Sequence, residues 1–77
     1  PFNPSTAIQY FLPQSGIVTL KVFDVNGKEI ETLVDGFRGV GTHSVQFNAH
    51  SLASGLYFYK LIVNNQAVDV KRMVLLR

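Results

Sequence analysis

Hydrophobic and polar residues alternate over short stretches of this chain, and helical periodicity is nearly absent. Residues 8–12 and 18–22 alternate in this way, and His43, Val45 and Phe47 share one face of a later segment. Period-2 alternation is typical of β-strands with one buried face. Turn residues recur about every 8–12 residues, which predicts an all-β protein.

Short runs of Gly, Pro and Asn predict the connections between these strands. Residues 13–16 predict a turn, because Pro presets its own φ and Gly accepts a positive one. Asn26-Gly27 predicts a hairpin with a type I′ turn, and Asn64-Asn65 predicts a second tight hairpin. Residues 35–41 predict a Gly-rich loop, and residues 48–54 a longer connection.

Three further segments predict strands with individual features. Residues 29–34 predict a short strand with a bulge or an edge position, because two of its apolar residues are three apart. Residues 56–63 are apolar on both faces, as expected for a strand in the middle of a sheet. The last strand is expected over about residues 66–76, with a bulge near Arg72 where its alternation changes phase.

These segments predict an all-β fold, an immunoglobulin-like antiparallel β-sandwich of six or seven strands, in one domain over residues 1–77. The absence of Cys and Trp excludes an antibody-type core. The expected core consists of Ile8, Tyr10, Leu12, Val18, Leu20, Val22, Leu33, Val45, Phe47, Leu52, Tyr57, Tyr59, Leu61, Val74 and Leu76.

Composition narrows the possible classes of protein. Hydrophobic residues make up 47% of the chain, which is too many for a disordered tail. The net charge is only +2 and is spread along the chain, so a nucleic-acid-binding stripe is not expected. No run approaches the roughly 20 apolar residues of a membrane helix, so no membrane insertion is expected. The chain does not begin with Met and is interpreted as a fragment of a longer protein.

The residues that carry chemistry are scattered. His43 and His50 have no carboxylate at ligand spacing, and zinc needs three or four converging ligands. Asp35 with nearby loop carbonyls offers too few oxygens for calcium, and Asp24 is expected to accept backbone N–H groups at the Asn26-Gly27 turn. The serines lack a base at motif spacing. We therefore expect no catalytic, cofactor-binding or metal-binding residue and no enzyme.

Three aromatic residues, Phe11, Phe23 and Phe58, occupy the phase opposite to the expected core. If they converge, they form an exposed apolar patch of the kind that marks an interaction site.

Four stretches, in order, resemble the type A C-terminal sorting domain of the type IX (Por) secretion system. They are residues 1–6 (PFNPST) with Ile8, residues 12–30, residues 41–43 with 52–61 (LASGLYFYKL at the latter), and residues 71–77 (KRMVLLR). A related fold occurs in the immunoglobulin-like domain of the flagellar hook-capping protein, so the fold alone does not fix the function.

The resemblance implies a non-catalytic sorting signal on a secreted cargo that lies N-terminal to it. The cargo enters the periplasm, the outer-membrane type IX translocon recognises the domain, and a sortase-like peptidase cleaves upstream of it. The cargo is then released or attached to the cell surface. The residues expected to take part in recognition are Gly55, Tyr57, Lys60, Lys71 and Arg77. The alternative is a structural spacer, or a cell-attachment or carbohydrate-binding module, appended to an extracellular enzyme.

Overall fold

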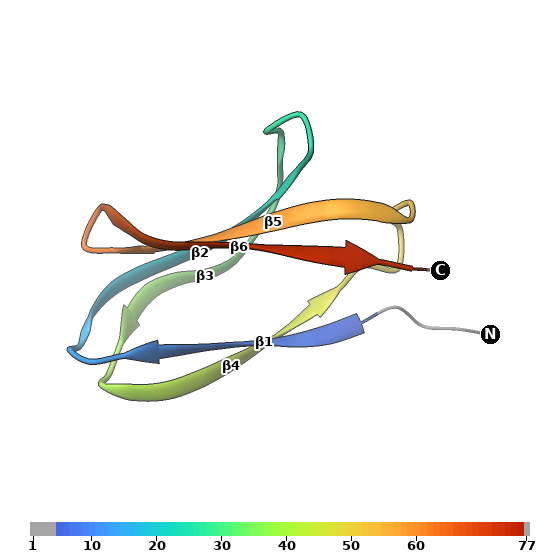
Figure 1. Cartoon of the computed structure of the whole chain (residues 1–77). Helices are drawn as coiled ribbons and strands as arrows, with labels where there is room; N and C mark the ends of the chain where they lie inside the picture. Colours follow the sequence, from blue (N-terminus) through green and yellow to red (C-terminus); the bar gives the residue numbers. More distant parts are fainter. Residues whose placement is uncertain (1–4, 77) are drawn as a thin grey trace.

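Six antiparallel strands form two unequal sheets in the computed structural model, which describes residues 5–76 (Figure 1). One sheet has the order β1-β4 and the other the order β3-β2-β5-β6. The predicted all-β sandwich is confirmed. The strands are β1 (Ser5–Leu12), β2 (Gly16–Asp24), β3 (Glu29–Arg38), β4 (Gly41–Asn48), β5 (Gly55–Val63) and β6 (Gln66–Leu75).

The core lies between the sheets and centres on β2. Val18, Leu20 and Val22 have no solvent exposure, because alternate residues of a strand point to the same face and β2 has a neighbour on each side. Of the expected core residues, nine are buried: Ile8, Tyr10, Leu12, Val18, Leu20, Val22, Phe47, Tyr57 and Leu61. Leu33, Val45, Leu52 and Tyr59 are partly buried against them, and the pattern missed Val34 and Ala49, which are buried.

The prediction of Val74 and Leu76 as core residues was wrong, since both are exposed. The bulge expected near Arg72 lies earlier in β6: Asp69 pairs with Leu61 and Ala67 with Ile62, which leaves one extra residue between them. From that point the strand alternates without a break. Met73 and Leu75 therefore pack toward the core instead of their neighbours.

β3 is longer than the predicted strand and includes most of the predicted Gly-rich loop. Asp35, Gly36 and Phe37 pair with the first half of β2, and only residues 39–40 connect β3 to β4. The loop was predicted because residues 35–41 contain three glycines. Of these, Gly36 lies in the ladder with β2, Gly39 in the connection, and Gly41 at the start of β4. The expected bulge and edge position of β3 are both confirmed.

The two predicted hairpins differ in their turns. Asn64 and Asn65 have φ of 50° and 67°, which confirms the tight turn between β5 and β6. The Asn26-Gly27 turn is not type I′, because only Gly27 has a positive φ, at 82°. As predicted, Asp24 stabilises this turn: its Oδ1 accepts the N–H groups of Asn26 and Lys28, both at 2.9 Å.

The sheets come nearest to each other where β3 meets β4. On the opposite side, the free edges of β1 and β6 leave the sandwich open (Figure 1). A two-stranded sheet covers only part of a four-stranded one, so the inner face of β6 extends beyond its cover. No helix among residues 5–76 is long and apolar enough to cross a membrane.

Truncation of Leu20 tests the central position of β2. Leu20→Ala removes a side chain with 0% exposure, so we expect the free energy of unfolding to fall by about 2–5 kcal/mol. The matched control is Ile17→Ala, at a residue of the same strand that is 52% exposed, with an expected loss under about 1 kcal/mol. Urea denaturation measures both, and equal losses would contradict the assignment of the core.

Candidate recognition surface

Two of the five predicted recognition residues, Gly55 and Tyr57, shape the corner where the chain enters β5. Tyr57 is buried, and its Oη donates a hydrogen bond of 2.8 Å to the carbonyl oxygen of Ala53. Gly55 has a φ of 156°, which residues with a side chain rarely adopt. Both residues therefore act on the shape of the domain.

Lys60, the third residue, lies on the outer face of the larger sheet, directly opposite Lys21 on β2. Like charges in opposite positions repel each other, and each ammonium has another partner. Lys21 Nζ is 3.2 Å from Glu29 Oε1, and Lys60 Nζ lies 5.5 Å from the centre of the Phe23 ring. The hydrogen bond from Lys21, with a second from Thr32, holds the pKa of the Glu29 carboxyl below its usual value.

Of the three aromatic residues in the phase opposite to the expected core, two converge near Lys60. Phe23 and Phe58 are directly opposite each other on β2 and β5, so these two do converge on the outer face. Phe11 does not join them: it lies on β1 in the other sheet, where it is exposed. The outer face thus combines two half-buried aromatic rings with neighbouring lysines.

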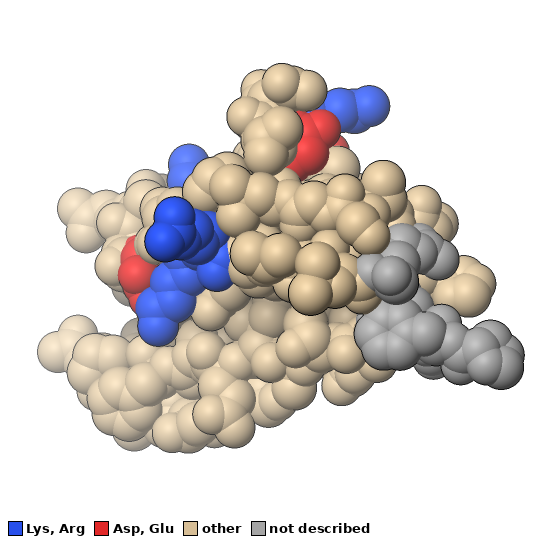
Figure 2. All heavy atoms as spheres, turned by 45° about the vertical axis from the view of Figure 1, so that its right-hand side comes forward, with Lys and Arg blue, Asp and Glu red and all other residues tan. Residues whose placement is uncertain are grey.

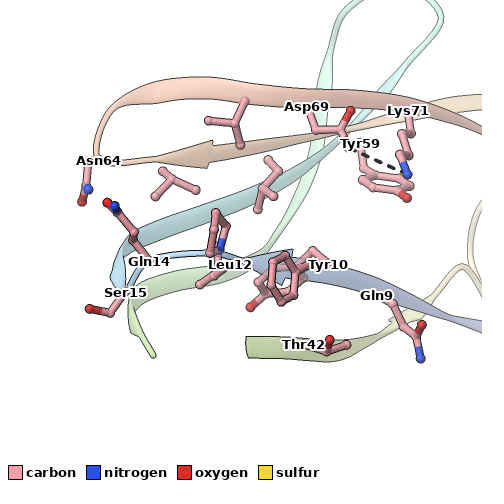
Figure 3. A pocket seen from close by; sticks show the side chains of 15 residues that line it. Gln9, Tyr10, Leu12, Gln14, Ser15, Thr42, Tyr59, Asn64, Asp69 and Lys71 are labelled. Carbon is pink, nitrogen blue, oxygen red and sulfur yellow. Dashed lines mark ion pairs between the residues drawn. The ribbon is translucent and has the colours of Figure 1, made fainter. Parts of the chain in front are cut away.

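Lys71, the fourth residue, points to the opposite face, into a groove of about 720 Å³ between β1 and the β5–β6 hairpin. Figure 3 shows Asp69 and Lys71 extending from β6 toward Tyr59, with Tyr10 on the far side. The Nζ of Lys71 is 3.8 Å from the Asp69 carboxylate, and both side chains are exposed. In Figure 2, basic side chains gather beside an acidic one at the edge of the upper sheet, above the hollow between the layers.

The structure therefore does not bring the predicted residues into one site. Lys60 and Lys71 lie on opposite faces of the sheet, because they sit one pair apart on neighbouring strands, where Lys60 pairs with Val70. Arg77, the fifth residue, and the opening residues 1–4 lie outside the described residues.

An exposed apolar strip on β6 and just beyond it was missed by the sequence analysis. Val70, Val74 and Leu76 are large and exposed, and Val74 pairs with Leu56 on β5. Val68 is also exposed, but it lines the groove on the other side of the strand. The signal was present, because residues 73–76 are all apolar, and four consecutive residues of a strand cannot all face one core.

The histidines have structural surroundings. The His43 ring stacks on Tyr10 with centroids 5.3 Å apart, and its Nε2 is 2.7 Å from the carbonyl oxygen of Gly39. The backbone N–H of His50 donates to Asn48 Oδ1. Within the described part of the chain, no three His, Asp or Glu side chains are grouped so as to hold a metal ion.

These features define a small β-sandwich domain with an open groove beside its last strand and several of its exposed apolar residues on or just beyond that strand. Residues 1–76 match the family described as the secretion system C-terminal sorting domain, and the chain belongs to this family. It is a C-terminal sorting signal for type IX secretion, a class of domain that is generally non-catalytic. No curated protein and no solved structure shows significant similarity to the chain.

Membership of the sorting-domain family implies two kinds of partner, the secretion machinery and a cargo. A sorting domain interacts with the type IX secretion machinery and is attached to an N-terminal cargo, which it directs to the cell surface or the extracellular space.

A substitution at Gly55 tests whether this residue shapes the corner. Gly55→Ala forces a side chain into an unfavourable φ although no atom lies within 4 Å of the added Cβ, so we expect a loss of about 1–3 kcal/mol. Gly39→Ala is the matched control, since its added Cβ also meets nothing within 4 Å and its φ lies outside the unfavourable range. Thermal unfolding compares the stability of the two variants. A Gly55→Ala variant as stable as the original chain would exclude a conformational role for Gly55.

Proposed function

We propose that the outer-membrane type IX translocon recognises this domain in its folded form, at the C-terminal end of the β5–β6 hairpin. Lys60, Lys71 and Arg77 are the basic contacts in this proposal. Gly55 and Tyr57 contribute indirectly, by fixing the corner from which β5 starts.

The exposed apolar residues at the end of the chain are the observation that carries the proposal. Val74 is 67% and Leu76 71% exposed, although their neighbours Met73 and Leu75 pack against the core. Exposed apolar residues in a group mark interaction sites in soluble domains. The same stretch lies within the residues that match the sorting-domain family.

The charges near this stretch favour an acidic partner. Arg72 is opposite Phe58 on the outer face, next to the pair formed by Lys60 and Val70. The acidic residue nearest along β6, Asp69, is on the groove side with Lys71. A receptor that approaches the outer face therefore meets Lys60, Arg72 and apolar side chains, and one that also reaches around the edge of β6 meets Lys71.

The proposed route has four steps. A separate N-terminal signal brings cargo and domain into the periplasm, where the domain folds. The translocon recognises the folded domain, and the cargo crosses the outer membrane. A sortase-like peptidase then cleaves upstream of the domain. Finally the cargo is released or joined to surface lipopolysaccharide.

A truncated reporter fusion tests the export function. We would fuse this chain to a periplasm-targeted fluorescent protein in a bacterium with a working type IX system. The complete chain should bring the reporter to the surface or the medium, and deletion of residues 74–77 should abolish this export. Cell fractionation and fluorescence measure the distribution. Normal export of the truncated fusion would contradict the proposal.

A point variant separates loss of recognition from loss of folding. Val74→Asp places a charge on the exposed strip, and Val40→Asp places the same charge at a residue that is 65% exposed in the β3–β4 connection. If Val74 contributes a contact of about 2 kcal/mol, affinity falls roughly 30-fold, so export should drop with Val74→Asp only. Circular dichroism of both variants checks the fold. Equal export of the two variants would place recognition elsewhere.

A further inference from the structure

β6 has one edge with no partner strand among the described residues. It is ten residues long and contains no Pro, and the side chains of residues 66–72 are all exposed. The free N–H and C=O groups of such an edge can pair with another strand. β6 therefore presents a surface on which the backbone of a further strand fits.

The charges at the middle of β6 favour a second copy of the same strand as its partner. Asp69 and Lys71 are two residues apart, on the same face, with Val70 between them. We propose that two copies of this domain associate by antiparallel pairing of their β6 edges, with the two-fold axis at Val70. Each Asp69 then lies opposite Lys71 of the second copy, and Val70 lies opposite Val70.

Backbone geometry makes this register nearly unique. Hydrogen-bonded and non-hydrogen-bonded pairs alternate along an antiparallel ladder, so a symmetric pairing must centre on a residue. Centring on Asp69, on Lys71 or on Arg72 would set like charges directly opposite each other. Such pairs are destabilising, whereas opposite charges across a ladder are stabilising.

The registers centred on Met73 and Val68 are less favourable than the one centred on Val70. A pairing centred on Met73 sets Lys71 opposite Leu75 and Arg72 opposite Val74, and it forms no pair of opposite charges within β6 (Gln66–Leu75). A pairing centred on Val68 falls on the bulge, where the extra residue between Ala67 and Asp69 interrupts the ladder. Among pairs that lie within β6, only the register at Val70 sets opposite charges against each other, in two pairs that symmetry makes identical.

The rest of the fold leaves room for this association. The joined sheet would have the order β3-β2-β5-β6 followed by the same four strands in reverse. Among the described strands β1 pairs only with β4, and the groove separates it from the inner face of β6. The grooves of the two copies would then adjoin beneath the paired edges. The pair between Asp69 and Lys71, 3.8 Å apart within one strand, is replaced by a directly opposite pair.

Charge exchange tests the register. Asp69→Lys and Lys71→Asp each convert both cross-strand pairs to like charges, and we expect each to weaken self-association by about tenfold or more. The double variant, which exchanges the two charges, should restore it, and a mixture of the two single variants should associate. Glu31→Lys on β3 and Lys28→Asp in the β2–β3 turn are controls with the same changes in net charge.

Sedimentation equilibrium of this 77-residue chain, at concentrations up to about 1 mM, measures the association. Circular dichroism confirms that each variant is folded. A monomer at every concentration overturns the proposal. So does a dimer that the single variants leave unchanged, since another surface would then hold it together.

A cysteine variant locates the axis independently, because the chain contains no Cys. Residues opposite each other across an antiparallel ladder are about 4.5–5.5 Å apart at Cα, within the range of a disulfide. Val70→Cys should therefore form a disulfide-linked dimer under mild oxidation. Val74→Cys should form it at a rate at least tenfold lower. Equal rates, or faster linkage at Val74, would overturn the register. Phe11→Cys is the control for association through the free edge of β1, and linkage there alone would overturn the choice of β6.

Discussion

Burial of the inner face of β2 is the constraint on which the rest of this structure depends. A chain of 77 residues buries only about 60–65% of the surface of its unfolded form, so few side chains can be removed entirely from water. Val18, Leu20 and Val22 are three of them. They require a neighbouring strand on each side and a covering sheet below. β3 and β5 provide the neighbours, and β1 with β4 provides the cover.

The unequal sheets follow from this constraint, and the surface of β6 follows from the unequal sheets. The sheets approach each other at β3 and β4, so the opposite side stays open and β6 lies at its rim. The residues of β6 match this position. Where the groove exposes its inner face, the side chains are Asp69 and Lys71; where the core continues, they are Met73 and Leu75. The inner face of β6 thus changes from charged to apolar residues at the point where the β1-β4 sheet begins to cover it.

Much of the fold could be predicted from the sequence, because alternation identifies strands whenever one face is buried. The strands at residues 8–12 and 18–22 were found in this way, and the Asn64-Asn65 turn from its tolerance of positive φ. Pairing overrode local signals elsewhere. A glycine such as Gly36 in a Gly-rich run indicates a loop, but in the structure Gly36 pairs with β2.

The main error of the prediction was which alternate residues of β6 face the core, since alternation alone does not locate a bulge. Residues 73–76 are continuously apolar, and their pattern allows either pair of alternate residues to face the core. Placing the bulge at Arg72 chose Val74 and Leu76, whereas the actual bulge before Asp69 buries Met73 and Leu75 instead. The candidate surface depends on this choice, so it could not be found before the pairing of β5 with β6 was known.

The positions of the proposed recognition residues also limit the shape of a receptor that could bind this domain. Lys60 and Lys71 lie on opposite faces of the sheet, so a flat receptor surface cannot contact both. A partner that clasps the edge of β6 can do so, because the side chains of a strand alternate between its two faces. The proposed pairing of two copies would occupy that same edge. Self-association and recognition along β6 would then be mutually exclusive wherever they overlap, and the charges of Asp69 and Lys71 would set the balance between them.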